Sequence, residues 1–321
     1  MAETLESTRE TMTIRPLRVG DLETADRVMR TAFGTFLGAP DPQAVFGDTD
    51  YVATRFRAAP DCAWAAELDG EVVGSNFATR WGSFGFFGPL TVRPDLWDRG
   101  IAGRLMEPVM AAFASWGLRQ SGLFTFPHSA KHLGLYQKHG FWPRFLNPVM
   151  SKPVEGGAAD LSTYSALSDG EREAARKAIR ALTDAVFPGL DLERELRAVH
   201  GQSLGDTVLL HVGGGLAGFA VCLCGAGTEA GSGSCFVKFG AVRPGPEAPQ
   251  RFEALLDACE ALAAHAGATR LAAGVNTGRL DAYRRLLGRG FRADLFGLAM
   301  RSHPANPDYD GPGDYVLDDL R

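Results

Sequence analysis

The 321-residue chain lacks several features that would assign it to a specialised class of protein. No apolar run approaches the roughly 18–20 residues that a membrane-spanning helix needs. The first residues, MAETLESTRETM, are polar and of mixed charge, without the apolar core of a signal peptide. The formal net charge is −5, so the chain shows no basic footprint for nucleic acid. With 45% hydrophobic and 22% charged residues, the sequence predicts a soluble globular protein with no membrane and no nucleic-acid partner.

Cysteine is scarce, and its spacing suggests no shared site. The five cysteines include no C-x-x-C pair, and an odd number in a chain of this length indicates a reducing compartment with free thiols. We therefore expect a cytoplasmic protein. Cys222 and Cys224 alternate along an apolar run, so we expect both on one strand face in the core. His128 and His132 have i,i+4 spacing with His139 beyond, but no further ligand accompanies them, so we expect no metal.

Residues 13–152 alternate between strand and helix patterns. TIRPLR predicts a strand, the next segment an amphipathic helix, and AWAAELDGEVVGSNFATRW two strands joined at Asp69-Gly70. FGFFGPLTV continues the sheet, and a glycine turn then opens a helix over about residues 99–117. SGLFTF predicts a strand, KHLGLYQKHG a helix and PVMSKP a last strand. The pattern is typical of a mostly antiparallel mixed sheet flanked by helices.

The same pattern starts again further along the chain. We expect residues 1–12 to be a disordered leader and residues 153–162 a linker. Residues 163–303 then repeat the order of strands and helices. The acidic end, residues 304–321, is expected to form a tail or a strap along the surface.

Residue spacing indicates that the second half is a copy of the first. Val92-Arg93-Pro94 recurs as Val242-Arg243-Pro244, and Gly140-Phe141 recurs as Gly290-Phe291, both at an offset of 150 residues. AELDGEVVG matches LHVGGGLAG at a smaller offset, and the Gly/Ser-rich AGTEAGSGS absorbs the difference. We therefore predict two similar mixed-sheet domains in tandem, with residues 85–93 and 235–242 in equivalent places.

A glycine-rich turn stands out in the segment VRPDLWDRGIAGRL, residues 92–105. It places Gly100, Ala102 and Gly103 where a strand passes into a helix. Such a turn exposes backbone N–H groups at a helix N-terminus, which suits a phosphate. A tight connection that uses glycine only for its turn geometry explains the same residues. On this stretch alone both interpretations stay open.

Two motifs together resemble the GCN5-related N-acetyltransferase (GNAT) superfamily. In the P-x-x-x-x-R-G-x-A turn, Gly100 and Ala102 fit the last two positions of the family's signature, Arg/Gln-x-x-Gly-x-Gly/Ala. LYQKHGF further along is the second marker. The resemblance implies fold class α/β (α+β, mixed sheet) with tandem GNAT-like domains. It implies a catalytic domain over residues 13–152 and a degenerate domain over residues 163–303.

The resemblance also implies acetyl-CoA as co-substrate and no metal. A pyrophosphate needs several N–H donors at a helix N-terminus, with no side chains in the way. In the family, the strand before the turn pairs with the pantetheine arm, and Gly88-Pro89 suits the family's bulge. The residues that we expect to bind acetyl-CoA are Leu90, Thr91, Val92, Trp97, Asp98, Arg99, Gly100, Ile101, Ala102, Gly103, Arg104 and Ser129.

Three of these positions depart from the family's pattern. Trp97 stands at the signature's first Arg/Gln, and we expect it to pack rather than to cover the ligand. Asp98 stands where glycine is frequent, and a carboxylate beside a pyrophosphate is unfavourable unless it points away. Ser129 stands where many members have an asparagine that contacts the pantetheine.

Tyr136 occupies the family's tyrosine position, whose hydroxyl often protonates the departing CoA thiolate. A half-buried aromatic residue on an amphipathic helix is the alternative interpretation. No acidic residue lies on FGFFGPLTV, where some members keep one. His128 and Glu67 are therefore the two candidate general bases.

The second half lacks the small residues of the glycine turn and the tyrosine. Bulky or charged side chains stand at the three small positions, and a leucine replaces Tyr136, although Tyr283 lies one turn away. We expect this half to shape the substrate cleft or the interface between the domains. The replaced positions are Gln250, Phe252, Glu253 and Leu286.

Together these observations predict an acetyl-CoA-dependent N-acetyltransferase with its active site in the N-terminal domain. It transfers an acetyl group to a primary amine of a small-molecule or amino-acid-like acceptor. A protein-lysine acetyltransferase stays open, and so does a non-catalytic acyl-CoA-binding regulatory module, because Trp97, Asp98 and Ser129 depart from the pattern. The expected partner is the small-molecule amine acceptor, and a homodimer stays open.

Overall fold

The computed structural model describes residues 12–156, 161–302 and 308–320. Apart from Met12, the predicted leader lies outside these residues, as do parts of the predicted linker and tail. Within the described ranges, no helix combines the length and the apolar character that crossing a membrane requires.

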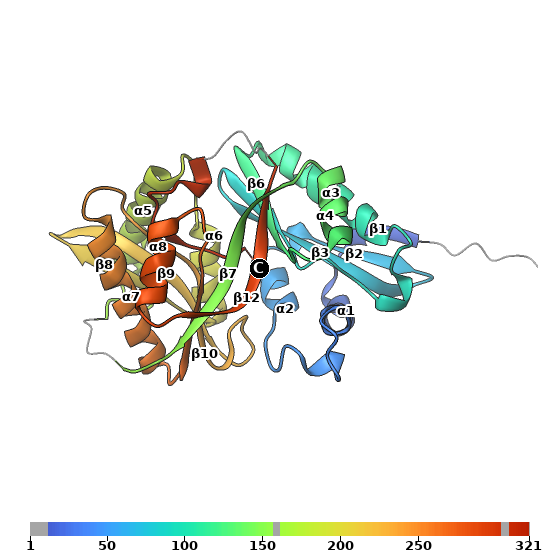
Figure 1. Cartoon of the computed structure of the whole chain (residues 1–321), viewed down its shortest axis with the longest axis horizontal. Helices are drawn as coiled ribbons and strands as arrows, with labels where there is room; N and C mark the ends of the chain where they lie inside the picture. Colours follow the sequence, from blue (N-terminus) through green and yellow to red (C-terminus); the bar gives the residue numbers. More distant parts are fainter. Residues whose placement is uncertain (1–11, 157–160, 303–307, 321) are drawn as a thin grey trace, which may run out of the picture.

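The first half alternates strands and helices in the predicted order (Figure 1). Its helices are α1 (Leu22–Phe36), α2 (Val52–Ala58), α3 (Ile101–Trp116) and α4 (Ala130–Lys138). Its strands are β1 (Met12–Pro16), β2 (Ala63–Leu68), β3 (Glu71–Trp81), β4 (Phe84–Phe87), β5 (Thr91–Val92), β6 (Gln120–Thr125) and β7 (Trp142–Pro153).

The second half repeats this order, beginning with its own pair of helices. Strands β6 and β11, helices α4 and α8, and strands β7 and β12 each start 150 residues apart, which is the offset found in the sequence. The helices are α5 (Asp169–Val186), α6 (Glu193–Gln202), α7 (Ala248–His265) and α8 (Leu280–Gly288). The strands are β8 (Gly205–Val212), β9 (Gly215–Gly225), β10 (Gly231–Val242), β11 (Arg270–Gly274), β12 (Arg292–Arg301) and, near the C-terminus, β13 (Val316–Leu317).

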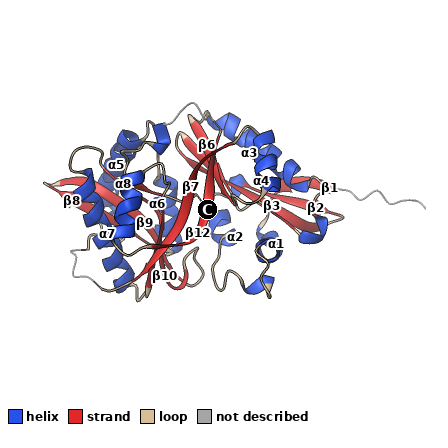
Figure 2. Cartoon of the chain, viewed as in Figure 1, coloured by secondary structure: helices blue, strands red, loops and turns tan. Residues whose placement is uncertain are grey.

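One mixed sheet runs through the whole chain (Figure 2). Its strand order is β1-β2-β3-β4-β6-β12-β7-β11-β10-β9-β8, with β5 paired to β3 and β13 paired to β10. The pairs β4/β6 and β10/β11 are parallel, and the other pairs of these strands are antiparallel. The predicted fold class, a mostly antiparallel mixed sheet flanked by helices, is therefore confirmed.

The last strand of each half lies beside the preceding strand of the other half. β12 pairs with β6, β7 pairs with β11, and the two exchanged strands pair with each other from Arg292↔Ser151 to Arg301↔Trp142. Figure 1 shows β7 and β12 side by side through the centre of the molecule. The sequence did not predict this exchange, because the residue pattern of a strand indicates which of its faces is buried but not which strand pairs with it.

Helices cover both faces of the sheet. On β3, Phe77 packs with the core under α1 and α2, whereas the next residue, Ala78, packs with the core under α3 and α4. Trp81 at the end of β3 joins a third core, in which Phe187 and Phe239 come from the second half. The two halves therefore share this third core as well as one sheet.

The described part of the acidic end, residues 308–320, is not a surface strap, in contrast to the prediction. β13 pairs with β10, and Asp318 is fully buried, with its carboxylate 3.0 Å from the guanidinium of the equally buried Arg279. Asp310 lies 2.7 Å from the buried Arg301. Tyr309 stacks on Phe84 of β4 with ring centroids 3.9 Å apart. The negative charges at this end neutralise buried arginines.

Replacing Asp310 by alanine should destabilise the fold strongly. Asp310 accepts hydrogen bonds from Arg301 and Asn276, and its loss leaves a fully buried guanidinium without its carboxylate. We expect the free energy of unfolding to fall by about 3–5 kcal/mol in urea denaturation. Asp294→Ala is the control, because it breaks a half-exposed pair with Arg270 and should cost about 1 kcal/mol or less. Equal losses for the two variants would contradict this account.

Candidate functional site

The turn before α3 presents an unobstructed helix N-terminus. Gly100 has φ +79°, in the left-handed region that favours glycine, and α3 begins at the next residue. A Cβ added at Gly100 or Gly103 would meet no atom within 4 Å. The first N–H groups of α3, on Ile101, Ala102 and Gly103, have no partner within the helix, so they are available to an anion.

Trp97 and Asp98 tie this turn to the neighbouring structure. The Trp97 indole Nε1 donates to the Val92 carbonyl at 2.8 Å, and the Lys131 ammonium lies 5.5 Å from the centre of its ring. Asp98 adopts φ +65° and forms an ion pair of 2.7 Å with Lys131 at the start of α4. Trp97 thus contacts its own chain, and its expected packing in place of a ligand contact stays a prediction; the Asp98 charge is offset by Lys131. Arg99 is exposed beside the turn.

The strand that leads into the turn parts from its neighbour β6. β4 pairs with β6 only as far as Phe86↔Gly122, and β5 pairs with β3. Between Phe87↔Ala78 and Thr91↔Ser75, three residues stand opposite two, so the strand carries a bulge at Gly88, Pro89 and Leu90. Within the described part of the chain, no strand pairs with the edge of β5 that faces away from β3. β5 therefore has an unpaired strand edge where it separates from β6, and we call this edge the slot.

One backbone donor points into this slot. The Arg93 N–H donates to the Val73 carbonyl of β3 at 2.8 Å. Because successive N–H groups of an antiparallel strand alternate in direction, the Val92 N–H points away from β3. The backbone of β5 therefore offers a hydrogen bond at the edge where the strands separate.

Tyr136 on α4 is buried near the bulge. Its ring contacts Phe87 at 5.7 Å between centroids in an edge-on arrangement. Burial raises the pKa of Tyr136 to about 12, although a hydrogen bond with Thr125 at the end of β6 acts to lower it. The phenol is therefore protonated at neutral pH and can donate a proton or a hydrogen bond.

The two candidate bases lie in different places. His128 is exposed in the turn after β6, and its ring stacks on Phe36 at 5.6 Å. Glu67 lies on β2, with β3 between it and the bulge, and its carboxylate accepts from Arg15 at 2.6 Å. His128 thus lies on the connection between β6 and α4, the helix that carries Tyr136. Glu67 lies away from the bulge, in an ion pair with Arg15.

Ser129 and Arg104 act within the protein itself. The Ser129 hydroxyl accepts from the His132 backbone N–H at 3.3 Å and caps α4. Arg104 donates to the Met12 carbonyl at 3.1 Å from the first turns of α3. Both residues flank the turn, and their predicted contacts with a ligand stay predictions.

The second half fills the equivalent places with its own chain. Phe252 is fully buried inside α7, and Glu253 forms ion pairs with Arg285 and Arg289. β13 pairs with Gly240 and Ala241 of β10, which stand 150 residues after Leu90 and Thr91. The C-terminal strand therefore occupies the slot that is left open beside β5.

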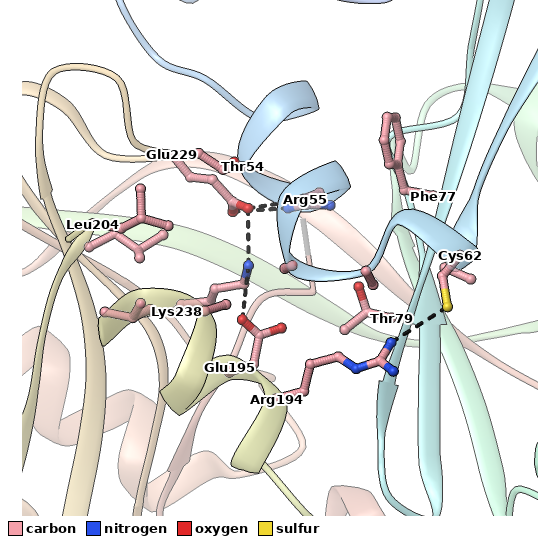
Figure 3. Close-up of a pocket in the computed structure, with 16 residues that line it drawn as sticks. Thr54, Arg55, Cys62, Phe77, Thr79, Arg194, Glu195, Leu204, Glu229 and Lys238 are labelled. Atoms are coloured by element: carbon pink, nitrogen blue, oxygen red, sulfur yellow. Dashed lines mark hydrogen bonds and ion pairs between the residues drawn. The ribbon is translucent and has the colours of Figure 1, made fainter. Parts of the chain in front are cut away.

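A buried charged network joins the two halves at the bulge (Figure 3). Arg55 of α2 binds both carboxylate oxygens of Glu229, at 2.8 and 2.9 Å, and its third nitrogen donates to the Gly88 carbonyl at 2.6 Å. Glu229 belongs to the loop between β9 and β10. Burial acts to raise the pKa of the Glu229 carboxyl, but Arg55 and Lys238 outweigh it and lower the pKa to about 2.

Lys238 of β10 continues this network toward α6. Its ammonium lies 3.0 Å from Glu229 and 3.4 Å from Glu195, and Glu195 also accepts from the Trp81 indole at 3.1 Å. Two cations and two carboxylates thus balance in charge. Sequence reasoning missed all four, although a lysine inside the apolar run CFVKFGAV is a local signal of a buried ion pair.

A small cavity adjoins the network and opens toward a groove between α2 and α6. The cavity has a volume of about 20 Å³, room for roughly one water molecule, and Cys62 and Thr79 line it beside Arg55. Arg194 reaches from α6 to within 3.6 Å of the Cys62 sulfur (Figure 3). Burial raises the pKa of the Cys62 thiol. The groove, of about 530 Å³, also carries Arg57.

Comparison with known proteins agrees with this geometry. Residues 29–141 match the model of the acetyltransferase (GNAT) family. A putative acetyltransferase from Pyrococcus horikoshii is similar in structure, with a TM-score of 0.66 and 17% identity over 98% of this chain and 96% of that chain. A GCN5-related N-acetyltransferase from Sphaerobacter thermophilus follows, with a TM-score of 0.57 and 16% identity over 90% and 95%. At identities this low, the structural similarity shows a shared fold and nothing further. No curated protein sequence matches the chain.

The two glycines of the turn should respond oppositely to alanine. Gly100→Ala forces an L-residue into the left-handed region, so we expect the free energy of unfolding to fall by about 1–2 kcal/mol. Gly103→Ala lies in the first turn of α3 with open space around it, and we expect a gain of a few tenths to about 1 kcal/mol. Urea denaturation of both variants measures this difference, and a shared sign would contradict it.

Proposed function

We propose that the first half binds acetyl-CoA and transfers its acetyl group to a primary amine, because residues 29–141 match the acetyltransferase (GNAT) family. The acceptor is a small molecule or an amino-acid-like compound. The observation that carries the proposal is the contrast between the two slots. The slot beside β5 is not covered by any described strand, whereas β13 fills the slot beside β10.

The residues of the first half suit each part of acetyl-CoA. The N–H groups at the start of α3 suit the pyrophosphate, with Arg99 and Arg104 at its rim. The edge of β5 that faces away from β3 suits the amides of the pantetheine arm, since an extended group can pair with an open strand edge. The thioester then lies at the bulge, where β5 and β6 part.

In the reaction, the neutral amine nitrogen attacks the thioester carbon and a tetrahedral intermediate forms. The Val92 N–H donates a hydrogen bond to the oxyanion. The C–S bond then breaks, and Tyr136 donates its proton to the departing thiolate. The nitrogen loses a proton to solvent or to His128, the candidate base on the β6–α4 connection. The amide and CoA are the products.

Calorimetric titration with acetyl-CoA should give one site per chain. We expect Gly100→Val to weaken binding by about 2 kcal/mol or more, roughly thirtyfold in Kd, because its side chain enters the phosphate turn. Gln250→Val, at the equivalent place in the second half, should leave the Kd unchanged. Two sites, or equal binding by Gly100→Val and the unsubstituted chain, would refute the assignment of the site.

Tyr136→Phe should lower turnover while acetyl-CoA affinity stays nearly intact. The hydroxyl is needed when charge develops on sulfur, so its loss affects the transition state more than the ground state. We expect kcat to fall at least about tenfold, measured as thiol release against a panel of amines at saturating acetyl-CoA. Tyr283→Phe is the matched control and should keep full activity. An unchanged single-turnover rate for Tyr136→Phe would remove this residue from the mechanism.

The same panel separates the competing functions. Thiol release with a small amine supports the proposed acceptor class. Release only with lysine-containing peptides indicates a protein-lysine acetyltransferase. Acetyl-CoA binding without thiol release from any amine or peptide indicates a regulatory module.

A further inference from the structure

The two halves carry bulges at equivalent positions, and one buried network joins them. In the β9–β10 ladder, Val237 pairs with Cys222 and Phe239 with Val221, so Lys238 is an extra residue. Lys238 stands 150 residues after Gly88, the glycine of the first bulge. The second half therefore retains the bulge, but a buried lysine stands at the position of the glycine.

The network takes one charged residue from a helix of each half. Arg55 comes from α2 and Glu195 from α6, two helices that follow the same order in their halves. Glu229 lies between the two cations, Arg55 and Lys238, in the close-up view (Figure 3). The side chains of Arg55 and Glu229 are 5% and 1% exposed, so solvent does not screen this pair.

Three hydrogen bonds, two to Glu229 and one to Gly88, fix the orientation of the Arg55 guanidinium. A planar guanidinium that binds both oxygens of a carboxylate is fixed in its plane, and its remaining nitrogen then points in a set direction. That nitrogen, Nη1, donates to the Gly88 carbonyl at 2.6 Å. A bulge has an extra residue outside the regular ladder, so it depends on such contacts for its position.

We propose that the second half is a positioning unit for acetyl transfer: Glu229, held by Lys238, orients Arg55, and Arg55 fixes the bulge beside which the thioester reacts. This inference rests on the function proposed above, since it assumes that the thioester lies at the bulge. It makes Arg55 and Glu229 positioning residues, because they act through Gly88 and not on the acetyl group. It also gives the half with the filled slot a role in the reaction.

The test compares two buried carboxylates that differ in what they hold. Glu229→Gln removes the negative charge and one of the two oxygens that bind the Arg55 guanidinium. Glu260→Gln is the matched control, because Glu260 binds Lys152 at 2.9 Å through both oxygens and is also buried, but its partner does not contact the bulge. Arg55→Lys is a second variant that retains a positive charge for Glu229 and lacks the fork that reaches Gly88. All variants are assayed at a temperature at which circular dichroism shows them folded.

The readouts are kcat from thiol release, with the best amine of the panel, and the Kd for CoA by calorimetry. We expect Glu229→Gln and Arg55→Lys to lower kcat by about tenfold to a hundredfold, because a shift of about 1 Å at a reacting group costs on that order. The Kd for CoA should change by less than about threefold, since the phosphate turn is untouched. Glu260→Gln should keep the kcat of the unsubstituted chain.

Two results would overturn the positioning role. One is an equal kcat for Glu229→Gln and Glu260→Gln, which reduces the network to a contribution to stability. The other is full activity of Arg55→Lys. An unsubstituted chain that neither binds acetyl-CoA nor releases thiol with any acceptor overturns the proposed function and this inference with it. Normal turnover by the unsubstituted chain and by both network variants overturns only the inference.

Discussion

The ladder between β7 and β12 is the constraint on which the rest of the structure depends. Backbone N–H and C=O groups in the middle of a protein must be paired, and here each half pairs its sheet through the last strand of the other half. Without β12, β6 would lose the partner on one of its edges, and without β7 the same would be true of β11. The shared core around Trp81, Phe187 and Phe239 follows from this exchange, because it brings β3 and β4 against α5 and α6.

Within this common framework the two halves differ in what occupies their slots. The first half has a glycine turn at Gly100 and an open strand edge, whereas the second half has Phe252 in the core and its own β13 along β10. The buried arginines Arg279 and Arg301 explain how an acidic segment can be held there: each takes a carboxylate from it. Charge pairing thus holds a segment of the chain's own backbone along β10.

Much of the fold could be predicted from the sequence, because the signals are local or repeated. α4 ends at Lys138, two residues before the Gly140 expected to end it, and the 150-residue offset recurs in the observed elements. The glycine turn was likewise found from small residues at a helix start. The strand exchange was not, since PVMSKP has the same alternation whichever strand lies beside it. Sequence reasoning also missed the burial of Asp310 and Asp318 and the pair of Arg55 with Glu229. The two members of each ion pair are 9 to 174 residues apart, and the sequence around one member does not indicate the other.

The exchange of strands has a consequence for the order in which the protein can be completed during synthesis. The edge of β6 that accepts β12 is made about 170 residues before β12 itself leaves the ribosome. Throughout that interval the nascent first half exposes an unpaired strand edge, together with apolar side chains such as Phe84 that Tyr309 later covers. An unpaired edge can pair with other chains, so we expect the nascent first half to be prone to association until translation has passed β12. The turn that suits the phosphate is synthesised early, whereas the sheet that supports it is closed only once β12 has been made.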